Sequence, residues 1–402
     1  MIYRDLLGER VSLLGFGAMR FPTSSDGEVD VPLTEQMIDL AIKNGVNYFD
    51  TAYPYHGGMS EIILGNALKK YPRESFYLAN KFPGHQLMKK YDPAAIFEEQ
   101  LEKCGVEYFD FYLLHNVYER SMGIYTDGEI GIIKYFLEEK KKGRIRHLGF
   151  STHALTRGLE EFLDLAGEAM EFCQIQMNYL DYTLQDAKGK YELLTSRGIP
   201  VIIMEPVRGG KLAALDDEDT ARLSSLRNGA SNASFAFRWL MDFDNISVIL
   251  SGMSNMAQVE DNLATFDKEA PLTDEEKHAL EDIAHKMLHS VPCTACRYCT
   301  DGCPMGLDIP LLIATCNELR VSQNLNAAMR IEFLPEDKKP TACIGCGACT
   351  SICPQSINIP EVLAELSERV EKMPKWADIS REREEAAEKV RALKNAKTKP
   401  EI

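Results

Sequence analysis

The sequence lacks a long hydrophobic run: nowhere do about 18 or more apolar residues follow one another, the length that a membrane-spanning helix needs. Basic residues are in the minority, with 45 Lys and Arg against 61 Asp and Glu and a net charge of −16. A surface that neutralises nucleic-acid phosphates requires a basic excess. We therefore expect neither a membrane protein nor a nucleic-acid-binding protein.

The N-terminal segment lacks the apolar core of a secretion signal. Residues 1–17 carry charges at Arg4, Asp5, Glu9 and Arg10. We therefore expect a cytoplasmic protein in a reducing compartment, where cysteines bind metal or stay free rather than form disulfides. The 402 residues, 45% of them hydrophobic, suit two or three domains or one barrel with an appendage.

Short apolar, β-branched or aromatic runs alternate with segments of helical periodicity from residue 10 to about residue 290. The candidate strands are VSLLGFGAM, NYFDTAY, FYLANKF, FDFYLLHNV, IRHLGFS, CQIQMNYL, PVIIMEPV and ISVILSGM. The candidate helices are Thr34–Lys43, Ser60–Lys70, Pro93–Cys104, Ile130–Lys142, Leu155–Ala166, Asp186–Arg197, Ser231–Met241 and Met256–Phe266, with Thr273–Leu288 leading out. This alternation predicts an α/β fold, a (β/α)8 TIM barrel. An open doubly wound sheet is the alternative, but no G-x-G-x-x-G motif with the expected acidic residue follows a strand.

Polar side chains stand at the carboxyl ends of the predicted strands, where barrels of this kind carry their chemistry. The positions selected by this rule are Asp50, Lys81, His115, Ser151, Gln176, Asn178, Glu205 and Ser251. Tyr55 lies in the loop after Asp50. Each ionisable residue taken alone could be structural, but four of them at the mouths of consecutive strands predict an active site.

Seven motifs follow one another along the first 290 residues: FDTAYPYHGGMSE, LANKF, YLLHNV, GFSTH, QMNYLD, EPVRGGKL and GMSNMAQVEDNL. In this order they resemble the aldo-keto reductases. The resemblance implies an oxidoreductase that moves a hydride from a nicotinamide cofactor to an aldehyde or ketone. It also implies a catalytic tetrad of Asp50, Tyr55, Lys81 and His115.

The chemistry of carbonyl reduction accounts for these four residue types. A carbonyl that accepts a hydride develops negative charge on its oxygen, so it needs a proton donor, which would be Tyr55. The pKa of a free tyrosine is near 10, and we expect the ammonium of Lys81 to lower it, with Asp50 holding Lys81 charged. His115 would donate a hydrogen bond that orients the carbonyl and stabilises the oxyanion.

The resemblance also implies a site for NADPH or NADH. It places the nicotinamide carboxamide against Ser151 and Gln176 and the ring against Tyr179. Gly-rich turns let the backbone approach phosphates, although simple tight turns are the alternative. The implied residues are Ser151, Gln176, Tyr179, Gly209, Gly210, Lys211, Gly252, Ser254, Gln258 and Asn262.

Two positions depart from the pattern of the family. NADPH-preferring members carry Arg or Lys just after the glycine of the eighth strand, where this chain has Ser254 and Asn255. NADH therefore stays open beside NADPH. Thr152 follows Ser151 where Asn is more common, which leaves one carboxamide contact open.

Two cysteine runs, CTACRYCTDGCP and CIGCGACTSICP, share the spacing C-x2-C-x2-C-x3-C-P. This spacing is typical of [4Fe–4S] ligation in bacterial ferredoxins; zinc and disulfides are the alternatives. Each run precedes an Ile-Pro pair that opens an apolar helix, so the segment is an internal repeat. We expect the cysteines outside the runs, Cys104, Cys173 and Cys316, to be core residues.

The cysteine-rich segment resembles a two-cluster ferredoxin, and its long helical connector resembles the α-helical dicluster modules of respiratory reductases. The resemblance implies crossed ligation, in which the fourth cysteine of each run binds the other cluster. The first implied set is Cys293, Cys296, Cys299 and Cys353. The second is Cys343, Cys346, Cys349 and Cys303.

We expect a barrel over residues 1–288, a smaller C-terminal α-helical dicluster ferredoxin-like domain over 289–372 and a charged helical tail over 373–402, frayed at its end. The expected function is NAD(P)H-dependent reduction of a small-molecule aldehyde or ketone to an alcohol, with Tyr55 as proton donor. Two [4Fe–4S] clusters would serve electron transfer or structure.

The alternative is an iron–sulfur redox partner protein with the barrel as a binding scaffold. Ferredoxin or another redox protein is then the candidate partner. Nicotinamide does not readily accept single electrons, so a link to the clusters would call for a flavin, for which the sequence has no motif.

Overall fold

The computed structural model describes residues 1–25, 27–86, 91–288, 291, 293, 295–321, 323–353 and 355–397. Within these residues the chain divides into two compact units. The first contains residues 1–280 together with the chain from residue 383 onward, and the second contains residues 281–382.

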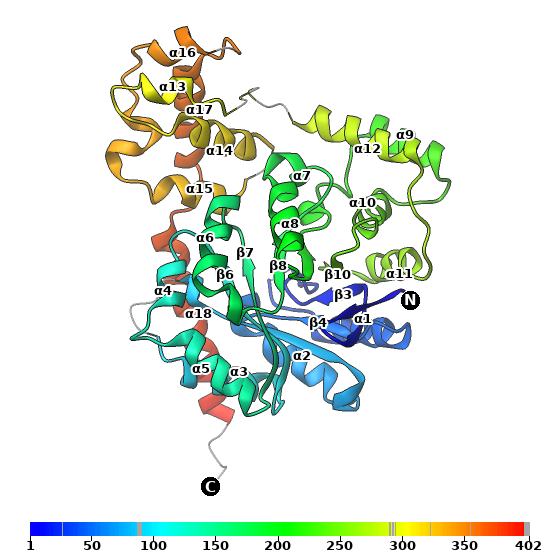
Figure 1. The fold of residues 1–402 in the computed structure, drawn as a ribbon. Coiled ribbons are helices and arrows are strands. Elements are labelled where there is room, and N and C mark those ends of the chain that lie inside the picture. The colour runs from blue at the N-terminus through cyan, green and yellow to red at the C-terminus, as the bar shows by residue number, and fades with distance from the viewer. Residues whose placement is uncertain are drawn as a thin grey trace. The chain divides into compact units, whose positions relative to one another are not determined.

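Parallel strands form a closed barrel in the first unit (Figure 1). Each strand pairs with the next along the chain, and the last pairs with the first to close the ring. In the described part of the chain the barrel has eight strands, which confirms the predicted (β/α)8 fold. They are β3 (Leu14–Gly17), β4 (Tyr48–Asp50), β5 (Tyr77–Phe82), β6 (Phe109–Val117), β7 (Ile145–Thr152), β8 (Cys173–Gln176), β9 (Val201–Met204) and β10 (Ile246–Ser251).

Helices connect the strands around the barrel (Figure 1), and apolar residues of these helices, such as Phe97 and Phe162, are buried in its hydrophobic core. α3, for example, begins where Asp92 caps its first turn and ends where Gly105 adopts a left-handed conformation, as the sequence favours. The helices of this part are α1 (Val31–Lys43), α2 (Ser60–Leu68), α3 (Pro93–Cys104), α4 (Met122–Thr126), α5 (Ile132–Lys141), α6 (Thr156–Ala166), α7 (Asp181–Leu184), α8 (Ala187–Ser196), α9 (Asp217–Leu226), α10 (Asn232–Met241), α11 (Met256–Thr265) and α12 (Asp274–Met287).

A short hairpin precedes the barrel and was not predicted. β1 (Tyr3–Leu6) and β2 (Glu9–Ser12) pair antiparallel, and the run predicted as one strand, VSLLGFGAM, breaks at Leu13 between β2 and β3. Leu6 and Val11 of the hairpin are fully buried in one cluster with the barrel residue Phe111. The hairpin thus supplies part of the barrel's apolar filling.

The second unit is helical and reproduces the internal repeat. α14 and α17 follow the two cysteine runs, each with proline at its second residue as predicted, and they pack against each other through a core that includes Leu312 and Leu363. Its other elements are α13 (Tyr298–Asp301), α14 (Ile309–Val321), α15 (Leu325–Glu332), α16 (Ala348–Ile352) and α17 (Ile359–Glu371).

The tail of the chain is helical, as expected: α18 runs over Trp376–Lys397. The predicted frayed end falls on residues 398–402, outside the described residues. Cys104, Cys173 and Cys316 are buried, which confirms their assignment to the core. No helix in the described part of the chain is both long enough and apolar enough to cross a membrane.

Candidate active site and cysteine-lined pockets

Strands β4, β5 and β6 place the expected catalytic side chains next to one another. Asp50 is the last residue of β4, Lys81 lies near the end of β5, and His115 lies near the end of β6. The Lys81 Nζ atom is 2.5 Å from Asp50 Oδ1 and donates to the Thr51 carbonyl at 2.8 Å. The same Nζ lies 5.1 Å from the centroid of the Tyr55 ring.

Tyr55 opens a short 3-10 helix, η1 (Tyr55–Gly58), whose residues His56 and Gly57 have left-handed backbones. Its ring meets that of His115 edge-on, with centroids 5.9 Å apart. The structure therefore brings together all four residues expected from the resemblance.

Burial dominates the ionisation of this group. It raises the pKa of Asp50 and lowers the pKa of Lys81, and their mutual attraction offsets part of both shifts. Burial also raises the pKa of Tyr55 well above 10, with the charges of Asp50 and Glu205 acting in the same direction. We expected Lys81 to lower the pKa of Tyr55; in the free site the net shift is upward, because desolvation outweighs the lowering influence of the cation Arg20. Tyr55 consequently keeps its proton at neutral pH.

Two residues that sequence reasoning missed surround His115. The ring of His85 packs against that of His115 with centroids 4.2 Å apart, and the hydroxyl of Tyr125 donates to the His115 carbonyl at 2.6 Å. Burial lowers the pKa of His115 well below 6.5, and the neighbouring His85 and Lys81 contribute. His115 is therefore a neutral imidazole, which can donate one hydrogen bond. The only sequence signal for His85 was its place just after β5.

Several residues expected at the cofactor are engaged with the protein. Gln176 donates to Asp181 Oδ2 at 2.8 Å, and Asp181 also pairs with Arg208. Ser151 Oγ accepts from the amide of Asn116 at 2.8 Å. The departure at position 152 has a structural use, because the Thr152 hydroxyl donates to the Val117 carbonyl at 2.6 Å.

The expected ring-stacking residue and the residues after β10 are also placed by local contacts. Tyr179 is buried, with 6% of its surface exposed. Asn262 is buried and donates to Ser251 Oγ at 2.8 Å, while Gln258 Oε1 accepts from the amide of Ser254 at 2.7 Å. These contacts tie the start of α11 to the end of β10.

The predicted phosphate-binding turns lie beside the exposed cation Arg20, which sequence reasoning also missed. Gly209 and Gly210 have left-handed backbones, and Lys211 is exposed beside them. A Cβ atom at Gly209 would lie 3.2 Å from Arg20 Nη2, and one at Gly252 would lie 3.1 Å from the Arg20 side chain. Arg20 thus spans the two glycine turns, and it pairs with Glu205 at 3.3 Å.

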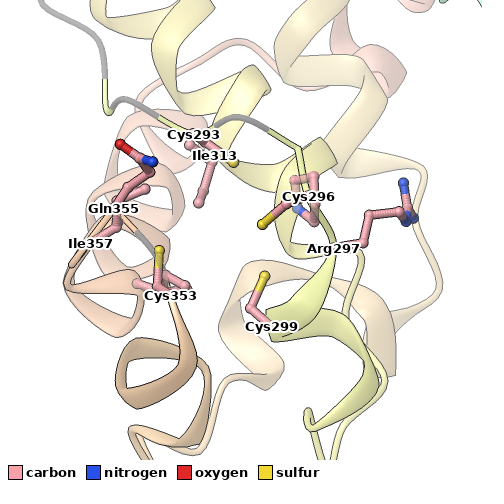
Figure 2. Close-up of a pocket in the computed structure, with 10 residues that line it drawn as sticks. Cys293, Cys296, Arg297, Cys299, Ile313, Cys353, Gln355 and Ile357 are labelled. Carbon is pink, nitrogen blue, oxygen red and sulfur yellow. The ribbon is translucent and has the colours of Figure 1, made fainter.

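The run cysteines gather in two pockets of the second unit. One pocket, of about 320 Å³, is lined by the sulfur-bearing residues Cys293, Cys296, Cys299 and Cys353. Figure 2 shows the sulfur atoms of Cys296, Cys299 and Cys353 directed toward a common space, while Arg297 points away. The other pocket, of about 330 Å³, is lined by Cys303, Cys343, Cys346 and Cys349. Each pocket therefore takes three cysteines from one run and the fourth from the other.

The two runs also share one backbone path. Residues fifty positions apart adopt the same left-handed conformation: Ala295 (φ 53°) and Gly345 (68°), Arg297 (65°) and Gly347 (74°), and Gly306 (58°) and Ser356 (54°). No disulfide joins any of the eleven cysteines in this structure. The halves of the unit are structurally equivalent, as the repeat predicted.

The closed parallel barrel, with its buried Asp–Lys pair, tyrosine and histidine at the strand ends, defines the first unit as a barrel oxidoreductase. The chain belongs to the aldo-keto reductases: the model of the "Aldo/keto reductase family" matches residues 13–285. The model of a "4Fe-4S dicluster domain" matches residues 292–357. The chain is thus an aldo-keto reductase that also carries an iron–sulfur module.

Curated relatives cover the barrel. The NADH-specific methylglyoxal reductase of Escherichia coli is 26% identical over 319 residues, which are 67% of this chain and 94% of the relative. The L-galactose dehydrogenase of Arabidopsis thaliana is 28% identical over 293 residues, covering 64% of this chain and 85% of the relative.

Solved structures agree with this assignment. An aldo-keto reductase from Bacillus halodurans in its holo form is 27% identical, with a TM-score of 0.56, and the match covers 70% of this chain and 96% of that one. An aldo-keto reductase from Klebsiella pneumoniae in complex with NADPH, 18% identical with a TM-score of 0.57, covers 71% of this chain and 96% of that one. The latter supports the fold alone.

Proposed function

We propose that this chain reduces a small aldehyde or ketone to an alcohol with a nicotinamide cofactor, and that Tyr55 is the proton donor. The observation that carries the proposal is the close grouping of Tyr55, Lys81, Asp50 and His115 at the strand ends. The relative named as a methylglyoxal reductase supports small aldehydes as the substrate class.

A bound reduced nicotinamide supplies the hydride that reaches the carbonyl carbon. The N–H of the neutral His115 holds the carbonyl oxygen by a hydrogen bond and stabilises the charge that develops there. Tyr55 gives its hydroxyl proton to that oxygen, which completes the alcohol. The phenolate left on Tyr55 then lies close to the Lys81 ammonium, whose position Asp50 fixes. The attraction between the Tyr55 phenolate and the Lys81 ammonium therefore stabilises the site only after the proton has left Tyr55.

The residues at the glycine turns fit a dinucleotide. The exposed cation Arg20 stands beside the glycine backbone at Gly209 and Gly252, where an anionic pyrophosphate could replace the Arg20–Glu205 contact. Ser254 and Asn255 supply no charge for a 2′-phosphate. We therefore expect NADH to be used at least as well as NADPH, in line with the name of the NADH-specific Escherichia coli relative.

The run cysteines hold two [4Fe–4S] clusters in the crossed sets implied by the ferredoxin resemblance. The four-cysteine lining of each pocket supports these sets. In the part of the chain that the structure describes, no three Cys, His, Asp or Glu side chains are arranged to hold a single metal ion. Four cysteines in the C-x2-C-x2-C-x3-C-P spacing that line one pocket suit a multi-iron cluster better than zinc.

The proposal is tested by steady-state reduction of methylglyoxal with NADH and with NADPH. Tyr55→Phe removes the donated proton, so we expect turnover to fall by about 10²–10⁴-fold. Titration of cofactor fluorescence should show unchanged NADH binding, because the ring remains.

Tyr53→Phe is the matched control, since Tyr53 is buried two residues away and donates to Glu99 at 3.3 Å. It should keep turnover near the wild-type value. Full turnover in Tyr55→Phe would contradict the assignment of the donor. A wild-type chain that binds neither cofactor would favour a scaffold role for the barrel instead.

A further inference from the structure

The C-terminal helix returns to the barrel. Residues 383–397 belong to the same compact unit as the barrel. A Cβ atom at Gly57 would lie 3.3 Å from the Cβ of Ala386, so α18 passes directly over the loop that begins with Tyr55. The tail is therefore more than the solvated helix that its charged sequence favoured.

One side chain of this helix faces the catalytic residues. Arg383 lies three residues before Ala386, and therefore on the same side of α18. It is half-buried, and its Nη1 atom is shielded from water. Burial is the main cause that lowers the pKa of His85, to about 3, and that of His115, and the positive charge of Arg383 acts on both imidazoles in the same direction.

Imidazoles gather in the neighbourhood of Arg383. His153 also acts on His85 and His115, so three imidazoles and one guanidinium converge here. His85 is 8% exposed, and the Nδ1 atoms of His85 and His115 have no hydrogen-bond partner among the described residues. The nearby carboxylate of Asp50 is already engaged with Lys81.

We propose that Arg383 determines specificity by binding an anionic group, a carboxylate or phosphate, carried by the carbonyl substrate. This inference rests on the proposed function and names its substrate class. The planar guanidinium can bind two oxygens of such an anion at once, which an ammonium cannot do. The hydride and proton transfers do not need Arg383, because Tyr55 and His115 serve the carbonyl oxygen. Its effect should therefore depend on the charge of the substrate.

The experiment compares matched aldehydes that differ in one charged group. One arm uses 4-carboxybenzaldehyde and benzaldehyde, and the other uses glyceraldehyde 3-phosphate and glyceraldehyde. We expect the wild-type chain to show at least about tenfold higher kcat/KM for a charged member than for its neutral partner. In Arg383→Gln we expect the KM for the charged member to rise by about 10–100-fold, so that the preference is lost. This is the range expected when a hydrogen bond to a charged group is removed. The arm with the larger effect identifies carboxylate or phosphate.

Controls separate recognition from support of the helix. Arg381→Gln removes an exposed arginine of the same helix and should change neither substrate pair. Arg383→Lys should recover part of the preference. Equal losses for charged and neutral substrates in Arg383→Gln, or a wild-type chain without preference, would overturn the inference while leaving the proposed function intact. A wild-type chain that reduces none of the four aldehydes would overturn the proposed function and this inference with it.

Discussion

At the scale of single residues, the buried pair of Asp50 and Lys81 has two roles that mutation can separate. Both side chains are almost inaccessible to water, and desolvation disfavours both charges. Replacing one partner of a buried ion pair strands the other, which typically costs about 3–5 kcal/mol of stability. The same loss changes the protonation of Lys81. In the proposed reaction the Lys81 ammonium stabilises the phenolate that proton transfer leaves on Tyr55.

We expect Asp50→Asn to lower stability and to move the alkaline limb of the activity profile toward lower pH. Without the Asp50 anion, the pKa of Lys81 falls further below 10.5, so the ammonium is lost at a lower pH as the pH rises. The measurement is kcat for methylglyoxal reduction between about pH 6 and 10. Asp39→Asn is the control, because Asp39 pairs with Lys70 at a surface where both side chains are 43% exposed. It should cost about 1 kcal/mol or less and leave the profile unmoved.

At the scale of elements, the sequence predicts those that local patterns encode and misses those that depend on tertiary placement. β6 and α3 have the predicted boundaries, because a continuous apolar strand and a capped helix are local patterns. The hairpin of β1 and β2 was missed, since its four-residue strands mix charges with apolar residues and show no clear alternation.

The same distinction separates the site residues that the sequence predicted from those that it missed. Asp50, Lys81 and His115 were predicted because they stand at strand ends, which the order of elements determines. His85, Arg20 and Arg383 reach the site through loops or through a helix about 300 residues away in the sequence, and no local pattern encodes that approach.

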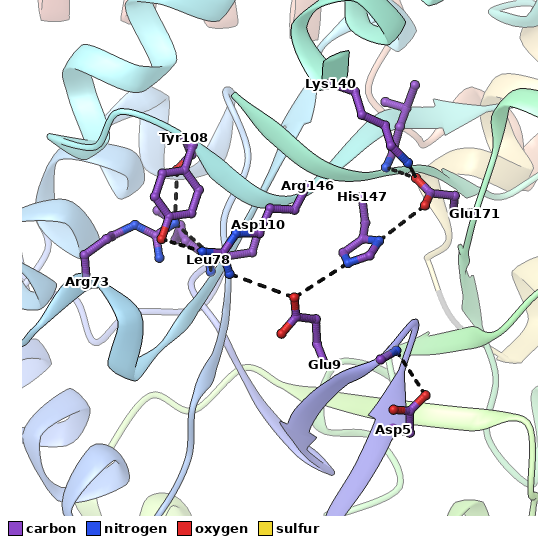
Figure 3. A network of polar contacts seen from close by, with 12 residues as sticks. Asp5, Glu9, Arg73, Leu78, Tyr108, Asp110, Lys140, Arg146, His147 and Glu171 are labelled. Atoms are coloured by element: carbon purple, nitrogen blue, oxygen red, sulfur yellow. Dashed lines mark hydrogen bonds and ion pairs between the residues drawn. The ribbon is translucent and has the colours of Figure 1, made fainter. Parts of the chain in front are cut away.

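The opposite end of the barrel holds a charged network that serves stability (Figure 3). Glu171 accepts hydrogen bonds from Lys140 and from the amide of Leu148, and contacts the His147 ring. Burial alone would raise the pKa of Glu171, but these partners outweigh it and lower the pKa to about 2. Because the folded pKa lies below the unfolded value, the stability that Glu171 contributes is present above about pH 4.5 and is lost as the pH falls toward 2.

We expect Glu171→Gln to remove the pH-dependent part of the stability that protonation of Glu171 causes. After a discount for the partial exposure of the pair, the contribution is about 1–2 kcal/mol at neutral pH. The mutant should therefore unfold at a lower temperature than the wild type at pH 7, with the gap closing toward pH 3. The control is Glu168→Gln, an exposed glutamate on the preceding turn. A gap that stays constant across this range would contradict the linkage.

At the scale of the whole molecule, two units with different chemistry share one chain. The barrel contains the four residues that we propose for hydride and proton transfer, a reaction that moves two electrons together and needs no iron. The cysteine unit is a structural duplication whose pockets each combine both halves. If the clusters bind in the crossed sets, iron joins the two halves, and folding of this unit depends on iron.

Crossed ligation can be tested with double substitutions that remove the same number of cysteines. In crossed sets, Cys293 and Cys303 serve different clusters, whereas Cys343 and Cys303 serve the same one. After anoxic reconstitution with iron and sulfide, we expect Cys293→Ala with Cys303→Ala to fall from about eight irons per chain to near zero. Cys343→Ala with Cys303→Ala should keep about four. Uncrossed ligation would reverse the two results.

The control is Cys316→Ala, which replaces a buried cysteine outside the runs and should keep all the iron. If methylglyoxal reduction survives in both double variants, the clusters are not part of the carbonyl reaction; a loss that tracks the iron would assign them to it.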